Sequence, residues 1–251
     1  MTPMAGQTVV KLKSFQCCMD HKTKFIFENE YFVYYGPPGV NDLHRHAAYQ
    51  IAVSENDVIQ ISDNDDNVVS GHILTVKPLT PHKIHCDGPI LLIYLSPRSE
   101  YCATLHKHFT QSNIVAIDEQ DLPFPIGCSI NAVTKALDDI VATPKPGLDP
   151  RLLAALADLE KNLGKSSILT TAKRCNLSRS RLRALAREQL GIPLSTWLMW
   201  RKIVASNKAL AAGQCFSEAA LAGGFADQAH FSRTMKRMFG VTPSKALRIY
   251  T

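Results

Sequence analysis

A short pattern of residues occurs twice in the last third of the chain, 48 positions apart. The first copy is Ala172-Lys-Arg-Cys-Asn-Leu-Ser178, and the second is Ala220-Leu-Ala-Gly-Gly-Phe-Ala226. Each copy has a small alanine, then a residue that tolerates a left-handed backbone (Asn176 or Gly224), then an apolar residue. A small residue lets two helices cross closely, and a left-handed residue turns the chain between them. We therefore predict one helix-turn-helix unit that occurs twice.

A basic amphipathic stretch follows each copy and is predicted to be a helix that fits the major groove of DNA. Ser178 and Asp227 are the predicted N-caps. The residues predicted to face inward are Leu182, Leu185, Phe231, Met235 and Phe239. The residues predicted to face DNA are Arg179, Ser180, Arg181, Arg183, Ala184 and Arg187 in the first unit, and Gln228, Ala229, Ser232, Arg233, Lys236 and Arg237 in the second. Any single arginine could instead contact only phosphate, because half or more of protein–DNA contacts go to the backbone.

The segment between the two units is predicted to be one continuous helix. It begins with Pro193 in its first turn, reaches about Ala212 and is ended by Gly213. About nineteen residues at about 1.5 Å each span on the order of 29 Å. Successive major-groove faces on one side of DNA lie about 34 Å apart, so this length suits one chain that reads two adjacent turns.

Charge is divided unevenly along the chain. Residues 1–147 hold 11 Lys and Arg against 16 Asp and Glu, whereas residues 148–251 hold 17 against 6. The sign changes at Thr143-Pro-Lys-Pro-Gly-Leu-Asp-Pro150, whose prolines and glycine can continue neither a helix nor a strand. We predict two domains, 1–147 and 148–251, of which the second is basic and suited to bind a polyanion.

The first domain is predicted to be an antiparallel β sandwich or barrel with flanking helices, which makes the whole chain α+β. Short apolar runs rich in branched and aromatic residues alternate with turn signals over 24–35, 49–53, 58–61, 68–76 and 90–95. Helices are expected around 98–109 and 128–141. The second has an apolar stripe, which either packs on its own sheet or pairs with a second subunit: Ile130, Val133, Leu137 and Ile140.

Residues 149–251 resemble the AraC/XylS family of transcription regulators. The resemblance rests on Ala222-Gly-Gly-Phe-Ala-Asp-Gln-Ala-His-Phe-Ser-Arg233, on Phe239-Gly-Val-Thr-Pro243, and on the connector stretches Leu190-Gly-Ile-Pro193 and Arg201-Lys-Ile-Val-Ala205. It implies that the helix beginning near Ser180 makes the main base contacts. The helix beginning near Gln228 would read bases on the next turn of DNA or position the protein there. Ala184 stands where the family commonly has Arg, and Ala186 where it has an aromatic residue. Arg183 or Arg181 would then take over base reading.

The resemblance also implies a sensing or dimerising domain before the DNA-binding module, often a small cupin-like barrel. His44-Arg-His46-Ala-Ala-Tyr-Gln50 and Pro78-Leu-Thr-Pro-His82 resemble the two cupin strand motifs in weakened form. One interpretation is a pocket for a small organic effector lined by His44, His46, Tyr49 and His82. Another is a metal site completed by Gln50, but a glutamine in place of a carboxylate argues against it, so we predict no metal and no cofactor. In the third, these histidines are only turn and core residues.

Together these features predict a sequence-specific DNA-binding transcription regulator, not an enzyme. By the family resemblance we expect an activator whose partners are double-stranded promoter DNA, RNA polymerase, a small-molecule effector and a second copy of the chain. Apolar runs such as Pro89–Leu95 are too short to cross a bilayer, so we expect no membrane partner and a cytoplasmic location. The alternatives are a metal-dependent cupin enzyme fused to a DNA-binding module, which would use His44, His46 and His82, and a nonspecific architectural DNA binder.

Overall fold

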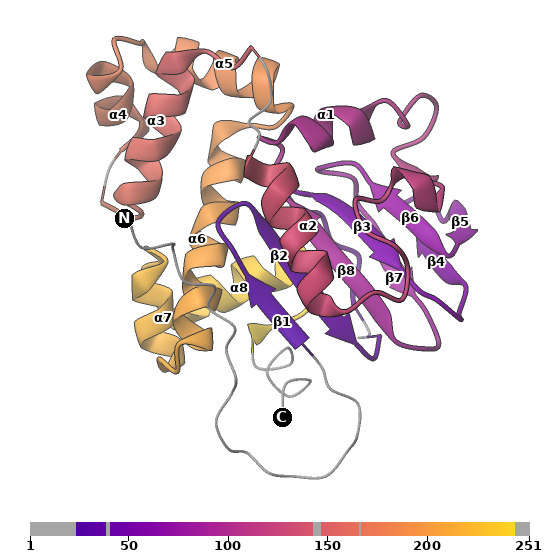
Figure 1. The fold of residues 1–251 in the computed structure, drawn as a ribbon. Helices are drawn as coiled ribbons and strands as arrows, with labels where there is room; N and C mark the ends of the chain where they lie inside the picture. The colour runs from indigo at the N-terminus through magenta and orange to yellow at the C-terminus, as the bar shows by residue number, and fades with distance from the viewer. Residues whose placement is uncertain (1–23, 39–40, 143–146, 166, 244–251) are drawn as a thin grey trace, which may run out of the picture.

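A computed structural model of the chain describes residues 24–38, 41–142, 147–165 and 167–243. An antiparallel β domain is followed by a set of helices, as predicted, and the predicted α+β class is confirmed (Figure 1). The predicted domain boundary falls partly on 143–146, which lie outside the described residues, so its exact position stays a prediction.

The β domain consists of two antiparallel sheets that pack against each other. The six-stranded sheet has the order β1 (Lys24–Phe27), β2 (Tyr31–Gly36), β8 (Ile90–Leu95), β3 (Tyr49–Val53), β6 (Ile73–Val76) and β9 (Ile114–Ala116). The smaller sheet has the order β5 (Val68–Gly71), β4 (Ile59–Ser62) and β7 (Lys83–His85). Ile59 and Ile61 alternate with exposed or half-buried neighbours, and both are fully buried toward the larger sheet.

Helices α1 (Glu100–His106) and α2 (Ile130–Ala142) cover the outer face of the large sheet. A short 3-10 turn at Glu119–Asp121 lies between them in the chain. The apolar stripe of α2 packs on its own sheet, where Val133 and Leu137 are buried beside Val33 and Ile93. The Tyr31 hydroxyl also donates to Asp138 of α2 at 2.8 Å. This stripe is therefore used within the chain, and a homodimer would need another surface.

The C-terminal part is helical as predicted, with short turns between elements. Its helices are α3 (Pro150–Lys161), α4 (Ile168–Arg174), α5 (Arg179–Leu190), α6 (Leu194–Ala211), α7 (Phe216–Ala222) and α8 (Gln228–Phe239). Asp149 caps α3 by accepting from the Arg151 amide, and Pro150 is its first residue. The connector α6 is close to the predicted range, although Pro193 is its N-cap and lies just before its first turn.

The two parts of the chain share one core. Phe239 at the end of α8 makes an edge contact with Phe32 of β2 at 6.1 Å between ring centroids, and Trp200 of α6 lies 6.2 Å from Tyr94 of β8. The same apolar cluster continues from these rings into both the sheets and the helices. Among the helices that the structure describes, none combines the length and apolar composition needed to cross a membrane.

Candidate nucleic-acid interface

The backbone of the two predicted units repeats bond for bond at the 48-residue offset. The Leu177 amide donates to the Ala172 carbonyl at 2.9 Å, and the Phe225 amide donates to the Ala220 carbonyl at the same distance. The turn residues Asn176 and Gly224 have φ of 52° and 71°, both in the left-handed region. Both alanines are fully buried. The predicted duplicated helix-turn-helix is thus present in the structure.

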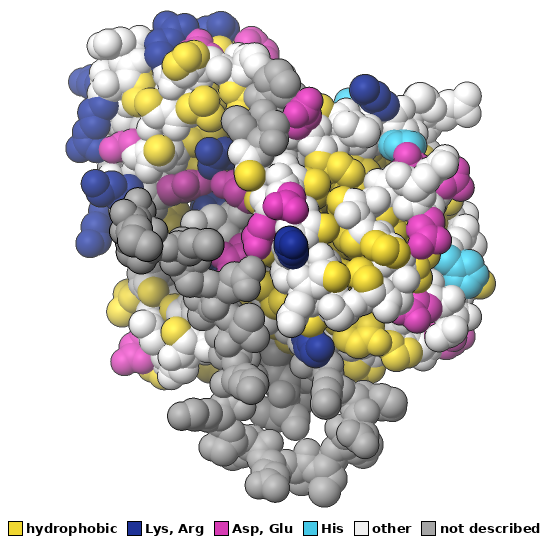
Figure 2. Space-filling model, in the orientation of Figure 1, with side chains coloured by type: hydrophobic (Ala, Val, Ile, Leu, Met, Phe, Trp, Pro, Cys, Tyr) yellow, Lys and Arg dark blue, Asp and Glu magenta, His cyan; other side chains and the backbone are white. Residues whose placement is uncertain are grey.

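The first unit presents α5 as an exposed basic helix. Ser178 caps it by accepting from the Arg181 amide at 3.1 Å, and Leu182 and Leu185 are buried, as predicted. Of the six residues predicted to face DNA, five are exposed and Ala184 is half-buried: Arg179, Ser180, Arg181, Arg183, Ala184 and Arg187. Figure 2 shows Lys and Arg side chains gathered over this end of the molecule.

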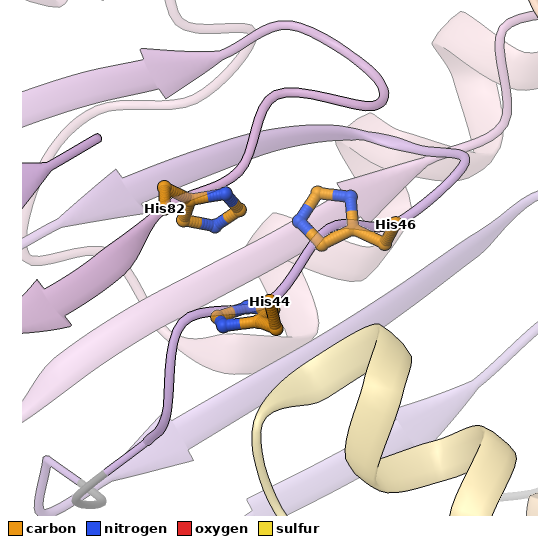
Figure 3. Close-up of side chains that lie close together, drawn as sticks. All are labelled: His44, His46 and His82. Carbon is orange, nitrogen blue, oxygen red and sulfur yellow. The ribbon is translucent and has the colours of Figure 1, made fainter. Parts of the chain in front are cut away.

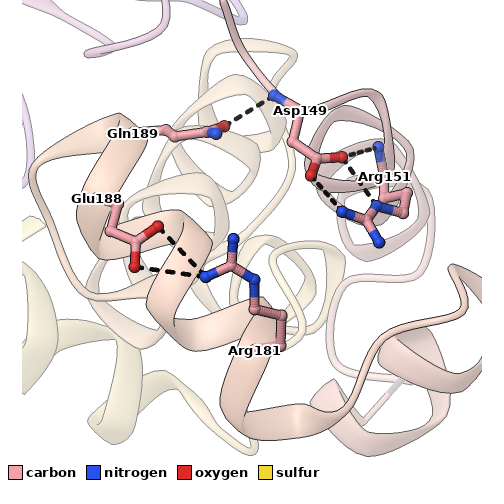
Figure 4. A network of polar contacts seen from close by, with 5 residues as sticks. All are labelled: Asp149, Arg151, Arg181, Glu188 and Gln189. Carbon is pink, nitrogen blue, oxygen red and sulfur yellow. Dashed lines mark hydrogen bonds and ion pairs between the residues drawn. The ribbon is translucent and has the colours of Figure 1, made fainter.

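The arginines of α5 differ in their surroundings. Arg181 lies 3.5 Å from Glu188 on the same helix (Figure 4), an exposed pair that contributes little to stability. Across from it, Arg151 lowers the pKa of Asp149 to about 2, mainly through a side-chain hydrogen bond. The guanidinium of Arg183 makes no hydrogen bond or ion pair with any described residue. It is therefore exposed and available for an external partner as far as the described residues go.

The second unit presents α8, but its end is in contact with the β domain. Asp227 caps α8 through the His230 amide at 2.6 Å, and Phe231, Met235 and Phe239 are buried as predicted. Ser232 is half-buried, and the other five predicted DNA-facing residues are exposed: Gln228, Ala229, Arg233, Lys236 and Arg237. Lys236 forms an ion pair with Asp42 at 3.1 Å, and the Asp42 amide lies 3.4 Å from the Gly240 carbonyl.

One residue that sequence reasoning missed fixes the second turn. The ammonium group of Lys202 on α6 donates to the Gly224 carbonyl at 2.6 Å and lies 5.7 Å from the centre of the Phe225 ring. Burial lowers the pKa of Lys202. Nothing in the spacing of Lys202 distinguishes it from a solvent-exposed connector lysine, so the sequence offered no signal for this role.

A chain of charged groups joins the β domain to the helices. Arg98 lies 3.1 Å from Glu30 and 3.2 Å from Glu160 on α3, and Glu160 lies 2.9 Å from the buried Arg201 on α6. Burial raises the pKa of Glu160, and the neighbouring Arg201 and Arg98 oppose that rise. Breaking such a pair leaves an uncompensated charge, so this network holds α3 and α6 in a set position on the β domain.

An apolar recess lies between the β domain and α6 and α8. Its empty space, including its open mouth, is about 750 Å³. No Lys or Arg is among the described residues of the lining, which includes Asn41 and Asn207. The other lining residues have rings or aliphatic side chains: Phe25, Phe27, Phe32, Tyr34, Pro38, Ile84, Ile90, Leu92, Tyr94, Met235, Phe239 and Val241. Residues of α8 therefore form part of its wall.

The residues predicted to line an effector pocket are only partly brought together. The imidazoles of His44, His46 and His82 form a compact buried cluster (Figure 3). Tyr49 is not part of it: its hydroxyl is 2.8 Å from His106 on α1, on the opposite face of the sheet. Successive side chains of a strand alternate between faces, so Tyr49 cannot share a face with His46 and Gln50. None of the four residues lines the apolar recess.

Residues 171–249 match a family model described as a helix-turn-helix domain. Among solved structures, ToxT from Vibrio cholerae with a bound unsaturated fatty acid aligns at 11% identity and a TM-score of 0.55, over 89% of this chain and 96% of that one. ToxT bound to (E)-4-(8-methylnaphthalen-1-yl)but-3-enoic acid aligns at 13% identity and 0.52, over 93% and 100%. An AraC-type regulator from Chromobacterium violaceum aligns at 26% identity and 0.36, over 38% and 88%. No curated protein sequence matches this chain.

Proposed function

We propose that the protein is an AraC-type DNA-binding transcription regulator that places α5 and α8 in two successive major grooves, because residues 171–249 match a helix-turn-helix family model. The observation that carries this proposal is the repeated turn, which presents two exposed basic helices at the two ends of one connector. At 18 residues, α6 is about 27 Å long, which is close to the spacing of grooves on one side of DNA.

Within this arrangement we propose a division of labour between base reading and backbone contact. Arg183 is exposed and unengaged within the described residues, and it lies in the second turn of α5, so it is placed to contact base edges. Arg237 lies in the last turn of α8, away from the N-terminal end of that helix, and is placed to contact phosphate.

Substituting these two arginines tests the division. We expect Arg183→Ala to cost about 1–3 kcal/mol at the cognate site and to relax preference at one base position, whereas Arg237→Ala weakens binding to all sequences about equally. Affinities for the site, for single-base variants and for a scrambled duplex are measured at fixed ionic strength. The cognate site comes from selecting bound fragments of the source genome.

Arg151→Ala is the matched control, because Arg151 is an exposed arginine of the same domain that lies outside both recognition helices. It should leave the sequence preference unchanged. If Arg183→Ala and Arg237→Ala behave alike, the division of labour is wrong. Equal affinity of the unmodified protein for native and scrambled sites would instead favour an architectural DNA binder.

We also propose that an uncharged apolar molecule binds in the recess and acts as the effector. Two ToxT structures with the same overall fold contain an unsaturated fatty acid and a naphthalenyl butenoic acid. The recess of this chain has the apolar lining of a ligand site, and among the described residues no cationic side chain lines it to pair with a carboxylate. Because Met235 and Phe239 of α8 form part of the wall, a ligand there would change the position of the second recognition helix.

Nile red, an uncharged apolar dye, provides the test. We expect the protein to bind it with a rise in fluorescence, and Leu92→Trp, which fills part of the recess, to weaken binding at least about tenfold. Leu43→Trp adds the same side chain at an exposed position outside the recess and should bind normally. If Leu92→Trp and Leu43→Trp bind Nile red with equal affinity, the dye binds outside the recess and the proposal is wrong.

Activation through RNA polymerase, homodimerisation, the absence of catalysis and a cytoplasmic location stay predictions. A dimer formed through α2 is disfavoured, since its apolar stripe is already covered.

A further inference from the structure

Three histidines from two segments of the chain converge inside the β domain. His44 and His82 form an antiparallel bridge, with backbone N–H to O distances of 3.0 and 2.8 Å, and His46 follows two residues after His44. One ring nitrogen from each lies within 4.8 Å of the other two. Their exposed fractions are 4%, 1% and 0%, so the cluster is shielded from bulk solvent. Figure 3 shows the three rings turned toward one another.

Each ring is held in the same tautomer. The Nδ1 atoms of His44, His46 and His82 each lie 2.9 Å from a backbone carbonyl oxygen, those of Asp42, Ala48 and Thr80. A carbonyl oxygen only accepts hydrogen bonds, so each Nδ1 must carry a proton. In a neutral imidazole, the ring nitrogen that carries no proton is a hydrogen-bond acceptor. Each Nε2 therefore has a free lone pair.

The remaining acceptors of the cluster cannot all be paired with donors. The side-chain oxygen of Gln50 lies 2.7 Å from His46 Nε2 and 2.9 Å from His82 Nε2, which places an acceptor against two acceptors. Reversing the amide would let its NH₂ group donate to both rings. It would then leave the amide oxygen without a donor, and the buried His44 Nε2 would still lack a partner among the described residues.

We propose that His44, His46 and His82 bind a divalent first-row transition-metal ion through their Nε2 atoms, with the side-chain oxygen of Gln50 as the fourth ligand. A cation satisfies all four lone pairs at once, and Nδ1–H groups bonded to carbonyls are the usual outer support of metal-binding histidines. Ligand nitrogens around a tetrahedral Zn²⁺ are about 3.4 Å apart, so small side-chain movements close the site.

The site lies beside the contact between the β domain and the DNA-binding helices. The His46 ring is 5.0 Å from Tyr94, 6.4 Å from Trp200 of α6 and 6.3 Å from Phe239 of α8. A bound ion would fix the His46 ring against which these residues pack. None of the three histidines lines the effector recess, although Tyr94 and Phe239 do.

Titration of the full chain, after treatment with a chelator and its removal, tests the site. We expect one Co²⁺ per chain with the intense visible absorption of a four-coordinate centre, and one Zn²⁺ that raises the melting temperature. His46→Ala should weaken Zn²⁺ binding at least about a hundredfold. His85→Ala should not change the affinity for Zn²⁺, because it removes an exposed histidine of β7, the strand that follows His82.

Gln50→Glu keeps the test decisive if His46→Ala fails to fold. A buried carboxylate should destabilise the metal-free chain, and Zn²⁺ should restore the melting temperature and bind more tightly than to the unmodified protein. A cluster that is only a hydrogen-bonded core network predicts no such rescue. The proposal is overturned if the unmodified chain retains no stoichiometric ion, or if His46→Ala and His85→Ala bind Zn²⁺ equally well.

Discussion

Gly224→Ala is expected to destabilise the protein by about 2–5 kcal/mol. The position has φ of 71°, where a residue with a Cβ costs about 1–2 kcal/mol. The added Cβ would also lie 2.7 Å from the backbone nitrogen of Gly164, and backbone cannot move aside as a flexible side chain can. Overpacking of this kind costs about 1–3 kcal/mol more. Urea denaturation followed by circular dichroism measures the loss.

Gly191→Ala separates these two contributions. Gly191 ends α5 with φ of 73°, but a Cβ there would meet nothing within 4 Å. It should therefore cost only the conformational part, about 1–2 kcal/mol. Equal losses at Gly191 and Gly224 would show that the contact with Gly164 does not constrain the second turn.

Trp200→Ala is expected to cost about 3–5 kcal/mol and to loosen the β domain and the helices together. Trp200 is 1% exposed, and its ring lies 5.7 Å from Phe239 and 6.2 Å from Tyr94, so truncation leaves a large cavity in the shared core. Because that core is continuous, we expect one cooperative unfolding transition that moves as a whole, seen alike by far-ultraviolet circular dichroism and by fluorescence of the remaining tryptophan.

The control for this substitution is Leu221→Ala, which truncates a side chain that is 65% exposed. Its cost should be within about 0.5 kcal/mol. Two separate transitions in the unmodified protein, with only one of them shifted by Trp200→Ala, would contradict a shared core.

Local signals made the helix-turn-helix units predictable from the sequence. Asn176 and Gly224 are among the few residue types that adopt a left-handed backbone readily, and Ser178 and Asp227 cap helices through their own side chains. Such features depend on neighbours within a few positions. The strands were predictable only in part. The predicted runs 24–35 and 68–76 each contain two strands, and β7 and β9, with only three residues each, show too little alternation.

Contacts between distant segments could not be predicted in the same way. The local sequence around Phe32 and around Phe239 is typical of a core residue within one domain. No local pattern shows that the two rings contact each other. Placing Tyr49 with the histidines was wrong in geometry, because strand alternation already puts it on the other face from Gln50. The convergence of His44 with His82 depends on a bridge between residues 38 positions apart.

The ion pair between Lys236 and Asp42 affects how many counterions DNA binding can release. A cation that contacts DNA drives association by displacing ions condensed on the phosphates, so each such contact steepens the dependence of affinity on salt. Lys236 must first give up a carboxylate of its own chain, and it thus exchanges one anion for another. The net gain from this contact is smaller than from a phosphate contact by Arg237 of the same helix, whose side chain has no hydrogen bond or ion pair with the described residues. Removing the Asp42 carboxylate should accordingly steepen the dependence of the binding free energy on salt.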